Sequence, residues 1–264
     1  RTNGVVCDPI TSQGFSVTLT ECFSTCPRYI QQRTVGRIES NPEPPTLFMG
    51  ENLLPAHLVE LVTCSDTFFL STCVPNLLRG ADCSHRGGRP GFVRLVVSGT
   101  STKLVWADFH GKGMNQTLGN AILYPNAGIL FIDFEHGSTL QLTGTLETKF
   151  TEPHQSLEET DRLCVFSIAK WRFTQNATPR RWQFFGYSTH HPLLKENDAL
   201  IKAMVPMEGG PSQIISGVAK WRAKGEESLF RAELMSCWAE SSNVRTYKFH
   251  LDRPLHFEPG QYCT

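Results

Sequence analysis

The sequence has no excess of charge of either sign, since Lys plus Arg and Asp plus Glu both number 25 among 264 residues. Binding to nucleic acid or to an anionic membrane surface needs a basic face, so this balance argues against both partners. It leaves room for a local basic pocket that holds one phosphate. No apolar run approaches the ~18 residues of a membrane helix, and no signal core follows Arg1. We therefore expect no membrane association and a cytoplasmic location.

Several signatures of catalytic and nucleotide-binding sites are also missing. Neither G-x-x-x-x-G-K-[ST] nor G-x-G-x-x-G occurs. Ser84 and His85 are adjacent, a spacing that does not make a nucleophile and its base. The nine cysteines are odd in number and scattered, which favours reduced thiols over a disulfide framework. Because Cys22 and Cys26 are the only close pair, we expect no metal site.

Strand-like runs dominate what is present. Residues 139–146 alternate apolar and polar side chains, and residues 128–134 form a continuous apolar run. Residues 91–97 and 103–106 flank a polar turn, as the arms of a hairpin do. Strands at this spacing predict a mainly β fold, either a barrel or a sandwich. Further strands are expected at 15–20, 67–72, 229–236 and 244–251.

Helices are expected to be few, and much of the second half is expected to be loop. The weak pattern over 173–211 predicts loop, with His190 and His191 solvated and with residues 179–182 included. The cluster at 82–94 is also expected to be a loop. Helices are predicted at 27–33, 53–62, 115–123, 156–162 and 195–204.

The segment from Asp82 to Arg94 carries the densest information about chemistry. Its Gly-Gly and Pro-Gly pairs let the backbone bend sharply and approach a ligand. Arg86, Arg89 and Arg94 offer forked donors to a phosphate or carboxylate.

A second segment adds Lys112 just before the helix predicted at 115–123, with Asn115 and Thr117 at its start. A helix N-terminus with a lysine and small polar side chains can hold a phosphate. Taken singly, either segment is more often an ordinary surface loop, but together they predict a phosphate site.

At these residues the sequence resembles the pyridoxamine-phosphate-oxidase-like FMN-binding split barrels. The resemblance runs in order from about Val62 to Thr148. It is carried by residues 66–72, by S-H-R-G-G-R-P-G-F-V-R at 84–94, by T-L-G-N at 117–120, by residues 126–134 and by L-Q-L-T-G at 140–144.

The resemblance implies a six-stranded antiparallel split barrel with peripheral helices, which binds FMN at a homodimer interface. The Arg- and Lys-rich strand and the basic serine motif of true pyridoxamine phosphate oxidases are absent, so the vitamin B6 substrate is not carried over. No catalytic residue is assigned, although His85 is the best candidate for handling a proton. The implied FMN contacts are Arg86, Lys112, Asn115 and Thr117 for the phosphate and ribityl chain, Pro90, Gly91 and Phe92 beside the ring, and also His85, Arg94 and Asn120.

The tail resembles the start of a ferredoxin-reductase-type FAD-binding domain, through residues 229–264 and the P-G-Q-Y turn at 259–262. Both ends of the chain look cut, so this start of an FAD domain is expected to be truncated. We expect residues 1–45 to be the tail of an upstream barrel-like module, 46–172 the split barrel, 173–227 a loop-rich connection and 228–264 the FAD-domain start.

The function implied is that of a flavin-binding oxidoreductase, in which the flavin supplies the redox chemistry. In an intact protein, NAD(P)H would deliver electrons through FAD by way of the missing C-terminal domain. The alternative is a non-catalytic flavin- or haem-binding module, or a dimerisation scaffold, because a fold does not fix a function.

Overall fold

The computed structural model places most of the chain and divides it into two compact units, Arg1–Val218 and Ala219–Thr264. It describes residues 2–7, 10–22, 24, 26–38, 42–75, 81–111, 113, 115–151, 160–194, 198–205, 213–215, 232–239 and 245–251, the last two as backbone only.

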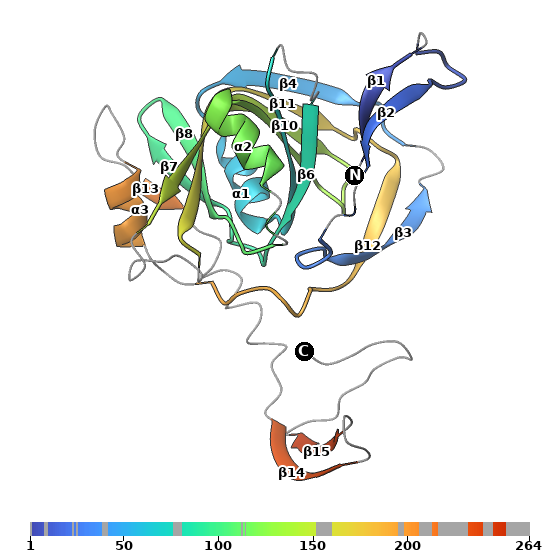
Figure 1. Cartoon of the computed structure of the whole chain (residues 1–264), viewed down its shortest axis with the longest axis vertical. Helices are drawn as coiled ribbons and strands as arrows, with labels where there is room; N and C mark the ends of the chain where they lie inside the picture. The colour runs from blue at the N-terminus through green and yellow to red at the C-terminus, as the bar shows by residue number, and fades with distance from the viewer. Residues whose placement is uncertain are drawn as a thin grey trace. The chain divides into compact units, whose positions relative to one another are not determined.

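The first unit is built on one antiparallel sheet, drawn in Figure 1, which confirms the mainly β class with peripheral helices. Within the described residues its nine strands run in the order β13-β7-β8-β11-β10-β9-β5-β6, and β4 pairs with β11. The two ends of this order, β13 and β6, do not pair with each other. The strands and helices of the chain are β1 Thr2–Val6, β2 Val17–Cys22, β3 Gln32–Ile38, β4 Thr46–Glu51, α1 Ala56–Cys64, β5 Thr67–Cys73, β6 Ala81–Gly87, β7 Arg94–Ser98, β8 Ser101–Ala107, α2 Gln116–Leu123, β9 Asn126–Ile132, β10 Thr139–Phe150, β11 Arg162–Gln175, β12 Arg180–Gly186, α3 Asp198–Met204, β13 Gln213–Ile215, β14 Ala232–Ala239 and β15 Arg245–Leu251.

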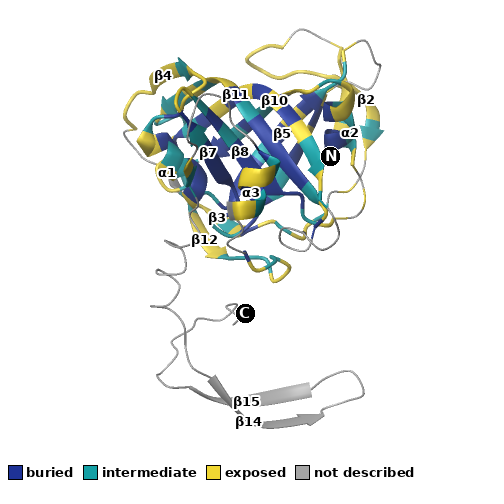
Figure 2. Cartoon of the chain, turned by 90° about the vertical axis from the view of Figure 1, so that its left-hand side faces the viewer, coloured by how far each residue is buried: buried dark blue, intermediate teal, exposed yellow. Residues whose placement is uncertain are grey.

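The sheet curls until strands that are distant in its order share one core. Phe68 on β5 meets Trp106 on β8 edge to face, with ring centroids 5.1 Å apart, although three strands separate β5 from β8. Phe131 on β9 and Phe92 also pack against Phe68. Side chains alternate along a strand, so one face of β10 can supply this core while the other stays open. Figure 2 shows this buried interior along β5, β7, β8 and β10.

The helices cover the ends and one outer face of the curled sheet. Leu58 and Val62 of α1 and Leu118 of α2 belong to the main core. Ile201 of α3 instead packs with Val96 and other residues from β7, β8 and β11 in a second, smaller cluster. None of the helices among the described residues is long and apolar enough to cross a membrane.

The strongest patterns predicted their elements well. The predicted β7–β8 hairpin forms with Ser98 opposite Ser101, and the helices at 53–62 and 115–123 are α1 and α2 with small shifts in their ends. Helix α3 covers the part of 195–204 that the structure describes. In the second unit, the strands predicted at 229–236 and 244–251 correspond to β14 and β15, which pair antiparallel. The P-G-Q-Y turn lies outside the described residues.

Three predictions of secondary structure were wrong. Residues 27–33 form a turn that enters β3 rather than a helix. The expected loop at 179–182 lies largely in β12, which pairs with β3. The glycine- and arginine-rich segment starts as strand β6 before it becomes a loop. Of the helix predicted at 156–162, residues 156–159 are not described, and Arg162 begins strand β11.

Candidate functional site

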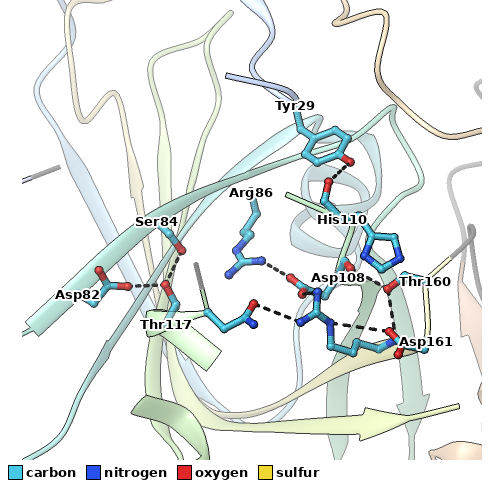
Figure 3. A network of polar contacts seen from close by, with 11 residues as sticks. Tyr29, Asp82, Ser84, Arg86, Asp108, His110, Thr117, Thr160 and Asp161 are labelled. Atoms are coloured by element: carbon cyan, nitrogen blue, oxygen red, sulfur yellow. Dashed lines mark hydrogen bonds and ion pairs between the residues drawn. The ribbon is translucent and has the colours of Figure 1, made fainter. Parts of the chain in front are cut away.

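A buried carboxylate joins two arginines at one end of the curled sheet (Figure 3). Asp108 directly follows β8 and is only 4% exposed. Its Oδ1 accepts from Nη1 of Arg86 on β6, and its Oδ2 lies 3.1 Å from Nη2 of Arg162 at the start of β11. The pairing of β8 with β11 brings Asp108 beside Arg162, because the Asp108 N–H donates to the Arg162 carbonyl at 3.0 Å.

The Asp108 carboxylate neither neutralises both guanidinium groups nor accepts hydrogen bonds from all of their N–H groups. Two guanidinium groups share one buried carboxylate in a region where each arginine side chain is about a fifth exposed (21% and 18%). The Asp161 carboxylate approaches Nε of Arg162 only to 4.0 Å and is 59% exposed, so the buried part of the cluster keeps one positive charge. The Nε atoms of Arg86 and Arg162 are buried and have no hydrogen-bond partner. Buried donors without an acceptor are costly, so an anion with several acceptor oxygens would stabilise the cluster.

The N-terminus of α2 adjoins one of these arginines, Arg162. Nη1 of Arg162 donates to Oδ1 of Asn115 at 3.1 Å, and Asn115 occupies the N-cap without capping the helix through its side chain. The first N–H groups of α2 therefore donate no hydrogen bond to this side chain. The partial positive charge of a helix N-terminus favours an anion at this place. Lys112, the predicted partner at this point, lies outside the described residues.

Two other predicted residues, Thr117 and Asn120, lie further along α2 itself. Thr117 is buried and hydrogen-bonds through its hydroxyl to the Asp82 carboxylate and to Ser84, 2.9 Å away. Asn120 lines a hollow of about 430 Å³ whose wall also includes Asn115 and the carboxylates of Asp82 and Glu21. Carboxylates in that wall disfavour an anion there, so the arginine side of α2 is the better place for a phosphate.

The glycine-rich turn itself is packed against the core. Gly91 has φ +90°, which favours glycine, and its N–H donates to the Thr63 carbonyl at 2.8 Å. Phe92 is 2% exposed and stacks on Phe68, with ring centroids 5.7 Å apart. Pro90 is half-buried, and Arg94 on β7 is completely buried. The structure thus keeps Phe92 and Arg94 inside the fold, and their contacts to a flavin stay predictions.

His85 lies on β6 one residue before Arg86, with its ring edge towards Phe69 at 5.8 Å. Burial lowers the pKa of His85 to about 4, with further lowering from the charges of Arg86 and Arg33. The imidazole is therefore neutral at pH 7. In that state it can accept or donate a hydrogen bond, but it does not carry a proton to give away as a strong acid.

Sequence reasoning missed the contacts that hold the glycine-rich turn. Gln31 is 5% exposed and donates both Nε2 hydrogens, one to the Asp66 carbonyl and one to the Gly88 carbonyl. Its Oε1 lies 2.7 Å from Nε2 of His191, so that nitrogen must carry the hydrogen. His191 was predicted to be solvated, but it is half-buried in the loop after β12, with its pKa lowered to about 4, first by burial and then by the charge of Arg89.

The two lowered histidine pKa values predict how stability depends on pH. An exposed histidine in the unfolded chain has a pKa of about 6.5, whereas His85 and His191 titrate near 4 when folded. Between these values the unfolded chain binds protons that the folded chain does not, so the free energy of unfolding should fall as the pH drops from 6.5 to 4. Urea denaturation across this range should show the fall, with a smaller slope for His85→Asn.

The exposed His57 provides the control for this pH dependence. The variant His57→Asn should keep the slope of the unmodified protein. An identical slope for His85→Asn and for the unmodified protein would show that the buried histidine does not cause the effect.

The arrangement brings together Arg86 and Asn115 of the predicted set, and adds Asp108 and Arg162, which the sequence did not indicate. It can hold an anionic group with several oxygens. It offers no nucleophile paired with a base. Among the described residues, no group of three or more His, Cys, Asp or Glu side chains could hold a metal ion.

Comparison with known proteins gives similarity in structure only. No family model matches the chain, and no curated protein matches it. A Clostridium acetobutylicum protein, described as related to general stress protein 26 of B. subtilis and of the pyridoxinephosphate oxidase family, is similar at 12% identity and a TM-score of 0.33 over 49% of this chain and 92% of its own.

Two further solved structures match to the same degree. HupZ of Group A Streptococcus, as a tagged protein, is similar at 7% identity and a TM-score of 0.32, over 53% of this chain and 99% of its own. The conserved hypothetical protein Rv2991 of Mycobacterium tuberculosis is similar at 14% identity and a TM-score of 0.32, over 49% of this chain and 89% of its own. Similarity at this level decides nothing about function, so the site has to be judged on its own residues.

Proposed function

We propose that the chain binds FMN and serves a flavin-dependent oxidoreductase. The observation that carries the proposal is the cluster of Arg86, Asp108 and Arg162 at the N-terminus of α2, in which two guanidinium groups share one buried carboxylate and both buried Nε atoms have no hydrogen-bond partner. A phosphate monoester supplies the missing charge and acceptors. When bound, the flavin would supply the electron-transfer chemistry.

The residues fit the phosphate end of FMN better than they fit its ring. Arg86, Arg162 and Asn115 would hold the phosphate, and Lys112 keeps its predicted place there. Asp108 would orient both guanidinium groups from behind. The half-buried Pro90 would border the ring, whereas Phe92 would support it only from within the core. His85, being neutral, would offer the ring a hydrogen bond without adding charge.

The wider assignment follows from the sequence resemblance. We propose that the chain forms a homodimer, and that in an intact protein the strands β14 and β15 belong to the start of an FAD-binding reductase domain that receives electrons from NAD(P)H. Binding of flavin without redox turnover would instead support the non-catalytic alternative.

The proposal is tested by titrating the protein with FMN and with riboflavin, which lacks the phosphate, while flavin fluorescence is measured. We expect FMN to bind more tightly than riboflavin. Arg162→Gln should weaken FMN binding by ~10-fold or more, the loss expected for one charge-assisted contact, and should leave riboflavin binding nearly unchanged.

The exposed Arg172 on the same strand gives the matched control, because Arg172→Gln removes an equal charge from β11 at a distance from the cluster. Equal losses in the two arginine variants would indicate a general charge effect. No binding of either flavin, or binding that ignores the phosphate, would remove the basis for the proposal.

A further inference from the structure

A second hollow, of about 730 Å³, lies at the other end of β11. Phe173 in its wall stands eleven residues beyond Arg162 on this strand, which puts it about 35 Å from Arg162 at the rise of an extended strand. Strand β4, the start of α1, the turn between β9 and β10, and β12 complete the wall. None of the predicted FMN contacts lines it.

Aromatic rings held in place form one side of the hollow. Nε1 of Trp171 donates to the Leu53 carbonyl at 3.0 Å. The same ring covers Gly50 so closely that a Cβ there would come within 2.5–2.8 Å of it. The Phe173 ring contacts the rings of Phe48 and His57, with centroids 6.3 Å and 6.0 Å away. These contacts hold the rings in place, so they form a fixed aromatic wall.

Another part of the rim is made of two turns that are hydrogen-bonded to each other, once through the backbone alone and once through a side chain. The Thr178 N–H donates to the Gly137 carbonyl at 3.0 Å, and the Asn176 N–H donates to the Ser138 hydroxyl at 3.3 Å. Gly137 has φ +71°, and a Cβ there would lie 2.2 Å from Nη1 of Arg181. The turn thus depends on glycine, and the rim is formed before any ligand arrives.

The charges of the lining favour a cation. Asp133 and Glu135 contribute two carboxylates against the single permanent cation of Arg181. Nη1 of that arginine is directed to the Thr178 and Arg180 carbonyls, at 2.7 Å and 3.1 Å. The carboxylates of Asp133 and Glu135 therefore outnumber the guanidinium of Arg181 in the lining. The faces of Trp and Phe rings also attract cations.

We propose that this hollow is a binding site for a planar aromatic cation, stacked on Trp171 and Phe173 with its charge towards the Glu135 side. The volume suits a ligand of two or three fused rings. This site is separate from the FMN proposal and does not depend on it.

Isothermal titration with 1-methylquinolinium, quinoline and quinoline-3-carboxylate at pH 7.5 tests the charge preference on one ring system. The cation should bind about 5-fold more tightly than the neutral ring, and the anion should bind most weakly. Phe48→Ala should weaken binding of the cation several-fold, and because Phe48 is 47% exposed its removal should leave the fold intact. Trp171→Leu provides a second variant of the wall.

Glu135→Gln should reduce the preference for the cation over quinoline and leave the affinity for quinoline unchanged. The exposed Glu147, on β10 and outside the hollow, supplies the control variant Glu147→Gln, which should keep the preference. Equal affinity for all three probes, or binding that Phe48→Ala does not change, would overturn the proposal. The FMN titration of Phe48→Ala should match that of the unmodified protein whichever result is found.

Discussion

Replacement of Asp108 with Asn should lower the free energy of unfolding by about 3 kcal/mol, because it leaves two partly buried guanidinium groups without their shared carboxylate. The backbone contacts of the residue should persist, since its N–H and carbonyl bond to Arg162 and Thr160 rather than through the side chain. Urea denaturation followed by circular dichroism measures the change.

Added phosphate distinguishes an ionic cause from a packing defect. If the loss in Asp108→Asn arises from uncompensated charge, millimolar phosphate should restore part of the stability by binding the folded state. The control is Asp161→Asn, which removes a carboxylate that is 59% exposed and 4.0 Å from Arg162, and should change stability by less than about 0.5 kcal/mol. Equal effects of the two variants would show that the buried carboxylate does not organise the arginines.

The predictable part of the fold is the part whose side chains alternate by burial. Residues 139–146 alternate because one face of β10 supplies the core, and α1 and α2 each bury one stripe. The sequences of strands β3 and β12 show no such alternation of apolar and polar residues. The two strands form a two-stranded ribbon with Val35, Phe184 and Phe185 exposed, so their apolar residues follow no buried face.

The candidate site was predictable only in part, for a related reason. Arg86 and Asn115 stand beside glycines and a helix start, features that local sequence displays. Asp108 and Arg162 are far apart in the chain and meet only because β8 pairs with β11. Gln31 and His191 meet across 160 positions, so their shared hydrogen bond has no local signature.

The curl of the sheet positions the arginine cluster and the aromatic hollow, and it depends on a few aromatic rings. Phe68 is completely buried and touches the rings of Phe92, Trp106 and Phe131. These contacts join β5 and β9 to β8 and to the glycine-rich turn, across the interior rather than along the hydrogen bonds of the sheet. Loss of this ring should therefore loosen the arginine cluster as well as the core.

Phe68→Ala should lower the free energy of unfolding by about 3–5 kcal/mol, the cost of removing a buried aromatic ring and leaving a cavity. Phe150 at the end of β10 is the matched control, because it is 68% exposed and its removal should cost less than about 0.5 kcal/mol. Urea denaturation measures both. FMN affinity in Phe68→Ala, measured at a temperature where the variant is folded, should fall, because Phe92 and the turn before it lose their support. A small stability change in Phe68→Ala, equal to that of Phe150→Ala, would mean that β5 does not close against β8 in solution.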